Sequence, residues 1–176
     1  MSGAADAGKT ALAVFVAALL QVTIVASMEP LGGTPDLLLV TLVALALLRG
    51  PIVGASAGFF GGLVVDTMTL DTLGFTSLLL TVAGYWIGRY GETTGRDRAH
   101  APVLSVFVVT ILYAVGALLL HAVLGDGVSA RYVILESLPP TILANLVLTF
   151  PVYAIVRRAM RTPPSPERVG EVRLLG

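Results

Sequence analysis

The sequence predicts an all-α membrane protein, a bundle of six transmembrane helices with both termini in the cytoplasm. Hydrophobic residues make up 56% of the 176 positions and charged residues only 12%, a balance that a soluble domain of this size cannot enclose in its core. The uncharged stretches approach the length that crosses a bilayer, and basic residues gather in alternate loops. Lipid is therefore the expected surrounding of most of the chain.

The uncharged runs define the expected spans, because a hydrocarbon core about 30 Å thick needs roughly 20 apolar residues in a helix. They predict spans at 10–28, 33–48, 51–66, 72–90, 102–124 and 132–156. The first run is longer than the apolar part of a signal peptide, so we expect it to be retained. The spans form one bundle over residues 1–161, and residues 162–176, rich in proline and charge, are expected to be a flexible cytoplasmic tail.

The second and third runs are short and are separated only by Arg49 and Gly50. They fit either two true spans or one re-entrant hairpin that returns to the same side of the membrane. A hairpin would bury the Arg49 guanidinium near mid-bilayer, at a cost of at least about 2.5–3.5 kcal/mol. Two true spans place Arg49 at the interface, and we therefore expect two spans joined by a tight turn.

The orientation follows from the basic residues. With the N-terminus inside, ten of the eleven lysines and arginines are cytoplasmic, and Arg131 is the exception. Six of the eleven acids fall on the outer side in the same arrangement. Both termini are therefore expected in the cytoplasm.

A stripe of small residues marks the third span, where Gly54, Gly58, Gly61, Gly62 and Asp66 share one helical face. Small residues at four-residue intervals let another helix approach closely. Internal packing within the bundle is the simpler interpretation. A face for a partner helix is the alternative.

The spacing of the polar residues does not indicate a catalytic site. Asp36, Asp66 and Asp71, with His121, lack the compact ligand spacing of a metal site, and we expect solvated loop acids. The two histidines cannot be tied to a serine nucleophile by any recognisable spacing. The zero formal charge gives no support to a nucleic-acid partner. We therefore expect that the protein is not an enzyme and binds neither a cofactor nor a metal.

Two amides lie within the apolar runs, Gln21 in the first and Asn145 in the sixth. Each is costly in lipid unless it finds a hydrogen-bond partner. Bonds between helices are the expected role, and a ligand contact is the alternative. Ionisable groups are nearly absent from the same runs, which weighs against an ion-coupled pump.

One stretch of the chain carries a family pattern. A Pro-Asp pair and an Arg-Gly pair flank a leucine-rich run, and a glycine stripe ending in aspartate follows. The matching residues are Pro35, Asp36, Arg49, Gly50, Gly54, Gly58, Gly62 and Asp66. In this pattern the chain resembles the bacterial rod shape-determining protein MreD family.

The resemblance implies a non-enzymatic subunit of the cell-elongation machinery in the bacterial inner membrane. It implies association with MreC, a single-span protein, and through MreC with the glycosyltransferase RodA and its transpeptidase. It also implies a fold similar to the substrate-binding subunits of energy-coupling-factor transporters, so a small-molecule (vitamin) binding subunit is the alternative function. Joined with the residue pattern, it suggests that the glycine stripe receives a partner helix, with lipid around the bundle. Asp36 and Asp66 would orient that partner at the outer rim.

Overall fold

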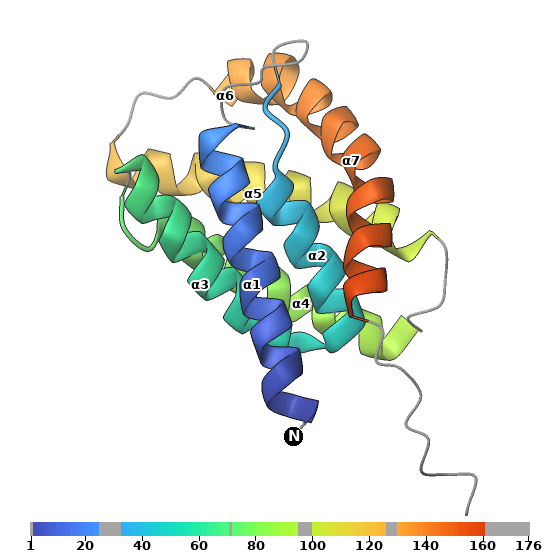
Figure 1. The fold of residues 1–176 in the computed structure, drawn as a ribbon. Helices are drawn as coiled ribbons and strands as arrows, with labels where there is room; N and C mark the ends of the chain where they lie inside the picture. The colour runs from blue at the N-terminus through green and yellow to red at the C-terminus, as the bar shows by residue number, and fades with distance from the viewer. Residues whose placement is uncertain (1, 25–32, 71, 95–99, 126–129, 161–176) are drawn as a thin grey trace, which may run out of the picture.

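The computed structural model describes residues 2–24, 33–70, 72–94, 100–125 and 130–160, and nearly all of them are helical. The long helices are α1 (Ser2–Thr23), α2 (Leu37–Arg49), α3 (Pro51–Thr69), α4 (Phe75–Thr94) and α5 (Ala101–Leu124). The last helical stretch is continuous: α6 (Ala130–Tyr132) leads through a π-helix (Val133–Ser137) into α7 (Leu138–Ala159). The all-α prediction is confirmed (Figure 1).

The α2 helix lies at the centre of the bundle, with α1 and α7 on either side of it (Figure 1). All ten residues from Leu38 to Leu47 are buried. A helix that is apolar all round is stable only when protein or lipid surrounds it on every side, and here the other long helices do so. Its thirteen residues span only about 20 Å.

The ends of α2 explain its short length. Residues 33–36 are not helical, so the predicted span at 33–48 begins four residues too early. The Asp36 side chain accepts a hydrogen bond from the Leu39 backbone nitrogen at 2.8 Å and caps the helix. At the other end Gly50 alone joins α2 to α3, with a φ of 94° that favours glycine. The predicted tight turn is confirmed.

Successive long helices run in opposite directions. Asp6 at the start of α1 pairs with Arg49 at the end of α2, and the Arg49 guanidinium also lies 3.4 Å from the Met160 sulfur just after α7. Phe75 at the start of α4 contacts His121 near the end of α5, with ring centroids 5.2 Å apart. Six successive crossings require this alternation.

Four helical stretches in the described part of the chain are long and apolar enough to cross a membrane. They are Asp6–Thr23, Pro51–Thr69, Ala101–Leu124 and Ala130–Ala159. The α2 helix is apolar but short, and α4 is not among the four. The structure therefore contains helices long and apolar enough to cross a membrane, and the count of six crossings with both ends inside stays a prediction.

Candidate functional site

Asp66, near the C-terminal end of α3, is fully buried and caps the next helix. Its carboxylate oxygens accept hydrogen bonds from the backbone nitrogens of Gly74, Thr76 and Ser77, at 2.9, 3.1 and 3.3 Å. The first turn of a helix has backbone N–H groups without partners in the helix, and a carboxylate satisfies them. The prediction of a solvated loop acid is wrong for Asp66, which is 0% exposed.

Asp36 is half-buried and is also a capping residue, at the start of α2. It therefore differs from the freely solvated acid expected from the sequence. Asp36 and Asp66 serve the beginnings of two different helices, α2 and α4, instead of a shared acidic rim. The third acid of that prediction, Asp71, lies outside the described residues.

Asn145 is fully buried at a crossing of α7, α5 and the start of α2. Its side-chain nitrogen donates to the Thr110 hydroxyl at 3.1 Å, and its side-chain oxygen accepts from the Asp36 backbone nitrogen at 2.7 Å. The expected hydrogen bonding between helices is present. It also fixes the position of the Asp36 backbone.

Gln21 holds the same segment from the side of α1. Its side-chain nitrogen donates to the Pro35 carbonyl at 3.2 Å, and its oxygen accepts from the Leu37 backbone nitrogen at 2.7 Å. The two intramembrane amides named from the sequence thus converge on residues 35–37. The Pro-Asp pair is the place where α1, α2 and α7 are joined.

Gly54, Gly58 and Gly62 lie on the face of α3 that packs against α4. A β-carbon added at any of the three would collide with the α4 backbone. The colliding atoms belong to Gly84, Leu80 and Ser77, respectively. The face that the sequence offers to a partner helix is occupied by α4 of the same chain, so internal packing is the interpretation that the geometry supports.

Gly61 lies on a different face of α3, the one that packs against α1 and α2. A β-carbon there would lie 2.8 Å from a Val14 methyl on α1 and 3.0 Å from a Leu38 methyl on α2. This glycine therefore brings α3 close to the two preceding helices.

Arg49 joins three helix ends on the side of the bundle opposite Asp36. It forms an ion pair with Asp6 at 2.9 Å, and the two side chains are 21% and 24% exposed. Its position at a helix end, beside the N-terminal helix, is the position expected for an interfacial arginine. Arg49 belongs to the family pattern, and the structure assigns it this contact.

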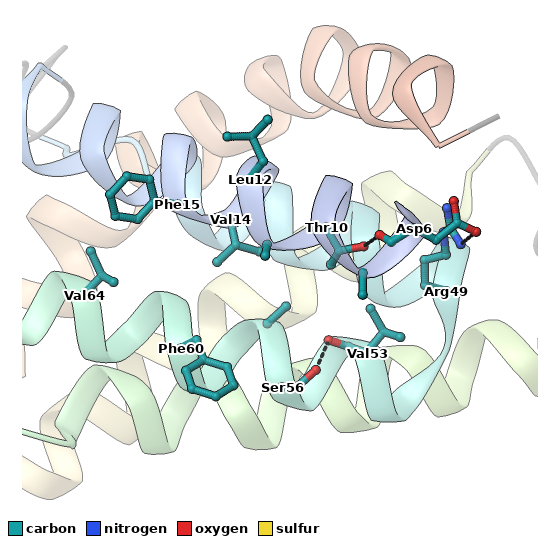
Figure 2. A pocket seen from close by; sticks show the side chains of 13 residues that line it. Asp6, Thr10, Leu12, Val14, Phe15, Arg49, Val53, Ser56, Phe60 and Val64 are labelled. Atoms are coloured by element: carbon teal, nitrogen blue, oxygen red, sulfur yellow. Dashed lines mark hydrogen bonds and ion pairs between the residues drawn. The ribbon is translucent and has the colours of Figure 1, made fainter. Parts of the chain in front are cut away.

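A groove runs along the bundle between α1 and α3, starting at the Asp6 and Arg49 pair (Figure 2). Its volume is about 840 Å³. Figure 2 shows the side chains that line it, which come from α1, from α3 and from Arg49 at the end of α2. Large apolar side chains and small residues share the lining: Leu12, Phe15, Phe60 and Val64, with Ala7, Ala11, Ser56 and Ala57.

Sequence reasoning missed this groove because no single segment carries it. The four-residue spacing of Ala7 and Ala11 on α1 is the signal that could have drawn attention to it. Leu12, Phe15 and Phe60 are 64%, 50% and 65% exposed, so the groove presents apolar surface outward.

A second cavity, of about 360 Å³, lies at the opposite end of the bundle among α2, α5 and the last helical stretch. Gln21, Asn145 and His121 all line it, together with Asp36. The sequence analysis named Asp36 with His121, and Gln21 with Asn145, but it could not show that the four residues line one cavity. Among the described residues, no group of three histidines or acids could hold a metal ion.

Comparison with known proteins gives one match. The family model described as rod shape-determining protein MreD matches residues 9–162, a range that includes most of α1 and all of the helices that follow. No curated protein and no solved structure matches the chain.

Proposed function

The chain belongs to the rod shape-determining protein MreD family, and on that premise we propose that it binds the membrane helix of MreC in the groove between α1 and α3. The family resemblance expected from the sequence is confirmed. The chain is accordingly a bacterial inner-membrane protein and a structural component of the machinery that determines rod shape. Binding of MreC and the organisation of peptidoglycan synthesis are our proposals.

The lining of the groove is the observation that carries the proposal. Lipid tails are as apolar as leucine, so helices in a membrane associate through close packing instead of hydrophobic burial. Ala11 and Ser56 are exposed small residues on facing helices and would let a partner backbone approach. Phe15 and Phe60 would flank that partner on either side.

The size of the groove suits one helix. Its lining on α3 extends from Val53 to Val64, and its lining on α1 from Asp6 to Phe15. At 1.5 Å per residue these stretches cover about 16 Å and about 14 Å, roughly half of the hydrocarbon thickness. A single membrane helix would be held along its cytoplasmic half and remain in contact with lipid beyond it.

The charged end of the groove fits the same partner. A single-span protein with its main part outside the cell has its flanking basic residues in the cytoplasm. Asp6 would face those residues, since its carboxylate is partly exposed at the end that we assign to the cytoplasm. The partner's outer part would then act on RodA and its transpeptidase, so that this chain helps organise peptidoglycan synthesis.

The alternative function, a vitamin-binding transport subunit, gains no support from the family match. The predicted similarity to energy-coupling-factor subunits also stays a prediction, because no solved structure matches.

The groove is tested by filling it. Ala11→Phe places a ring among the lining residues, and Ala122→Phe places the same ring on an exposed position of α5, outside the groove. We expect Ala11→Phe to reduce the MreC recovered by copurification in mild detergent about tenfold, a loss of about 1.4 kcal/mol. Ala122→Phe should recover wild-type amounts. Equal recovery with both variants, at equal membrane levels, would disprove the groove as the site.

A further inference from the structure

We propose that the 360 Å³ cavity at the end of the bundle opposite Arg49 binds a small ligand carrying an ammonium group, with the Asp36 carboxylate as its counter-charge. This inference is independent of the helix groove, which lies at another part of the molecule. The cavity is within the range of small-molecule sites, about 300–1,000 Å³, near its lower limit.

The charge of the lining selects the class of ligand. Among the described residues that line the cavity, Asp36 carries the formal charge, and neither lysine nor arginine is present. Neither of the two ion pairs in the described part of the chain involves Asp36. A phosphate or carboxylate ligand would therefore face a negative group without a cation to balance it, whereas an ammonium group would form a charge-assisted bond.

Capping leaves Asp36 able to bind a ligand. One of its oxygens accepts from the Leu39 backbone nitrogen. An ionised carboxylate has about four acceptor positions on its two oxygens, so further donors can be accommodated. Helix capping and ligand binding are compatible at this residue.

The position of Asp36 is set by its neighbours before any ligand arrives. Asn145 holds its backbone nitrogen, and Gln21 holds the residues on both sides, Pro35 and Leu37. A site whose charged group is already oriented loses less conformational entropy on binding. The hydrogen bonds that join α1, α2 and α7 thus also preorganise the cavity.

The wall formed by the last helical stretch is unusual. Val133 and Ser137, the first and last residues of the π-helix, both line the cavity. The π-helical turns found within α-helices occur frequently at functional sites, because they shift side chains out of α-helical register. This irregularity is a second observation that points to the same cavity.

The remaining surface is mixed. Hydroxyl groups of Thr34, Ser137 and Thr141 can donate or accept, while Leu39 and Leu118 provide apolar contacts. A short alkylammonium matches this combination. Its source could be a soluble amine or the ethanolamine head group of a lipid, and the experiment separates the two.

The test measures thermal unfolding of the full chain in nanodiscs of phosphatidylglycerol. The probes are n-butylamine, butanol and butyrate, which share an alkyl chain and differ in charge. Because a ligand that binds only the native state stabilises it, we expect butylamine at saturation to raise the midpoint by about 2–4 °C. Butanol and butyrate should raise it by much less. An equal rise with butanol would overturn the proposal, as would no rise with butylamine.

Two variants tie the effect to the cavity. Asp36→Asn removes the charge but keeps a good capping residue, so the fold is retained and the butylamine effect should disappear. Ala117→Phe fills the cavity and should abolish the effect while leaving Asp36 in place. Glu92→Gln, an exposed acid on α4 that does not line the cavity, is the charge-matched control and should keep the full effect. Persistence of the effect in Asp36→Asn would contradict the assignment.

Nanodiscs that contain phosphatidylethanolamine distinguish the source. A lipid head group in the cavity would raise the midpoint of the wild type without added amine, but not that of Asp36→Asn. A soluble amine would give the butylamine effect equally in both kinds of disc. A rise with phosphatidylethanolamine that is the same in wild type and Asp36→Asn would argue against this site.

Discussion

Ser77 of α4 donates two hydrogen bonds to α3, and Asp66 accepts one of them. The Asp66 carboxylate accepts from the Ser77 backbone nitrogen at 3.3 Å, and the Ser77 hydroxyl donates to the Phe59 carbonyl of α3 at 2.8 Å. Gly62 allows this approach because a β-carbon there would meet the Ser77 backbone. Asp66, the aspartate that ends the family pattern, thus helps to hold the antiparallel helices α3 and α4 together within the chain.

Asp66→Ala should destabilise the folded bundle. It removes the acceptor of three backbone N–H groups at a partly buried helix start, and loss of a capping side chain costs about 0.5–2 kcal/mol. Asp66→Asn should cost less, because its amide oxygen still accepts. The measurement is the thermal midpoint in detergent at low and at high salt. The loss should be the same at both, since no exposed charge pair is involved; a loss confined to low salt would favour contact with a basic partner.

Gly58→Leu should prevent proper folding instead of selectively weakening partner binding. The leucine side chain would clash with the backbone of Leu80 on α4. Gly8→Leu on α1 is the matched control, because a β-carbon at Gly8 meets nothing within 4 Å. We expect Gly58→Leu to aggregate on detergent extraction and Gly8→Leu to elute as a single peak in size-exclusion chromatography. If the Gly58→Leu protein were well folded but no longer copurified with MreC, the glycine stripe would be supported as the partner-binding face.

The Arg49 and Asp6 pair should contribute modestly to stability. Both side chains are about a fifth to a quarter exposed, and solvent and salt weaken the attraction within such ion pairs. A double-mutant cycle with Arg49→Gln and Asp6→Asn, followed by thermal unfolding, measures this coupling. A coupling energy near zero would show that Arg49 holds its position without Asp6.

The sequence contained enough information to predict the helices but not the contacts between them. Apolar runs and charge clusters indicate which segments are helical because each depends on local composition, but not their ends: α1 begins at Ser2, eight residues before the predicted span. The Asp36 cap had a local signal as well, an aspartate directly before an apolar run. The Asp66 cap had none, because its acceptors serve a helix that begins nine residues later, at Phe75.

The candidate sites depend on distant segments and were predicted only in part. Gln21 and Asn145 were recognised as polar groups within apolar runs, and Asp36 was taken as a loop acid, but their convergence on one segment follows from the packing of α1, α2 and α7. The groove between α1 and α3 likewise requires two parallel helices separated by α2 in the sequence. Periodicity within one helix cannot show which other helix will face it.

The number of crossings can be measured directly, because the chain contains no cysteine that would label in the background. Ile52, at the start of α3, is 80% exposed, and Leu70, at its end, is 91% exposed. Six crossings place Ile52 at the cytoplasmic face and Leu70 at the outer face. A re-entrant hairpin would leave Leu70 outside but bury Ile52 within the bilayer.

Single-cysteine variants at these two positions therefore distinguish six crossings from a re-entrant hairpin. With a membrane-impermeant maleimide on intact spheroplasts, we expect Leu70→Cys to label and Ile52→Cys to remain unlabelled. After permeabilisation Ile52→Cys should label too, as should Glu92→Cys at the end of α4, the cytoplasmic reference. Continued protection of Ile52→Cys, with Glu92→Cys fully labelled, would mean that α2 and α3 enter and leave on the same side. The alternating helix directions and the position of Arg49 beside Asp6 favour six crossings, in which Ile52→Cys labels after permeabilisation. Both observations place the turn at Gly50 next to the N-terminal end of α1.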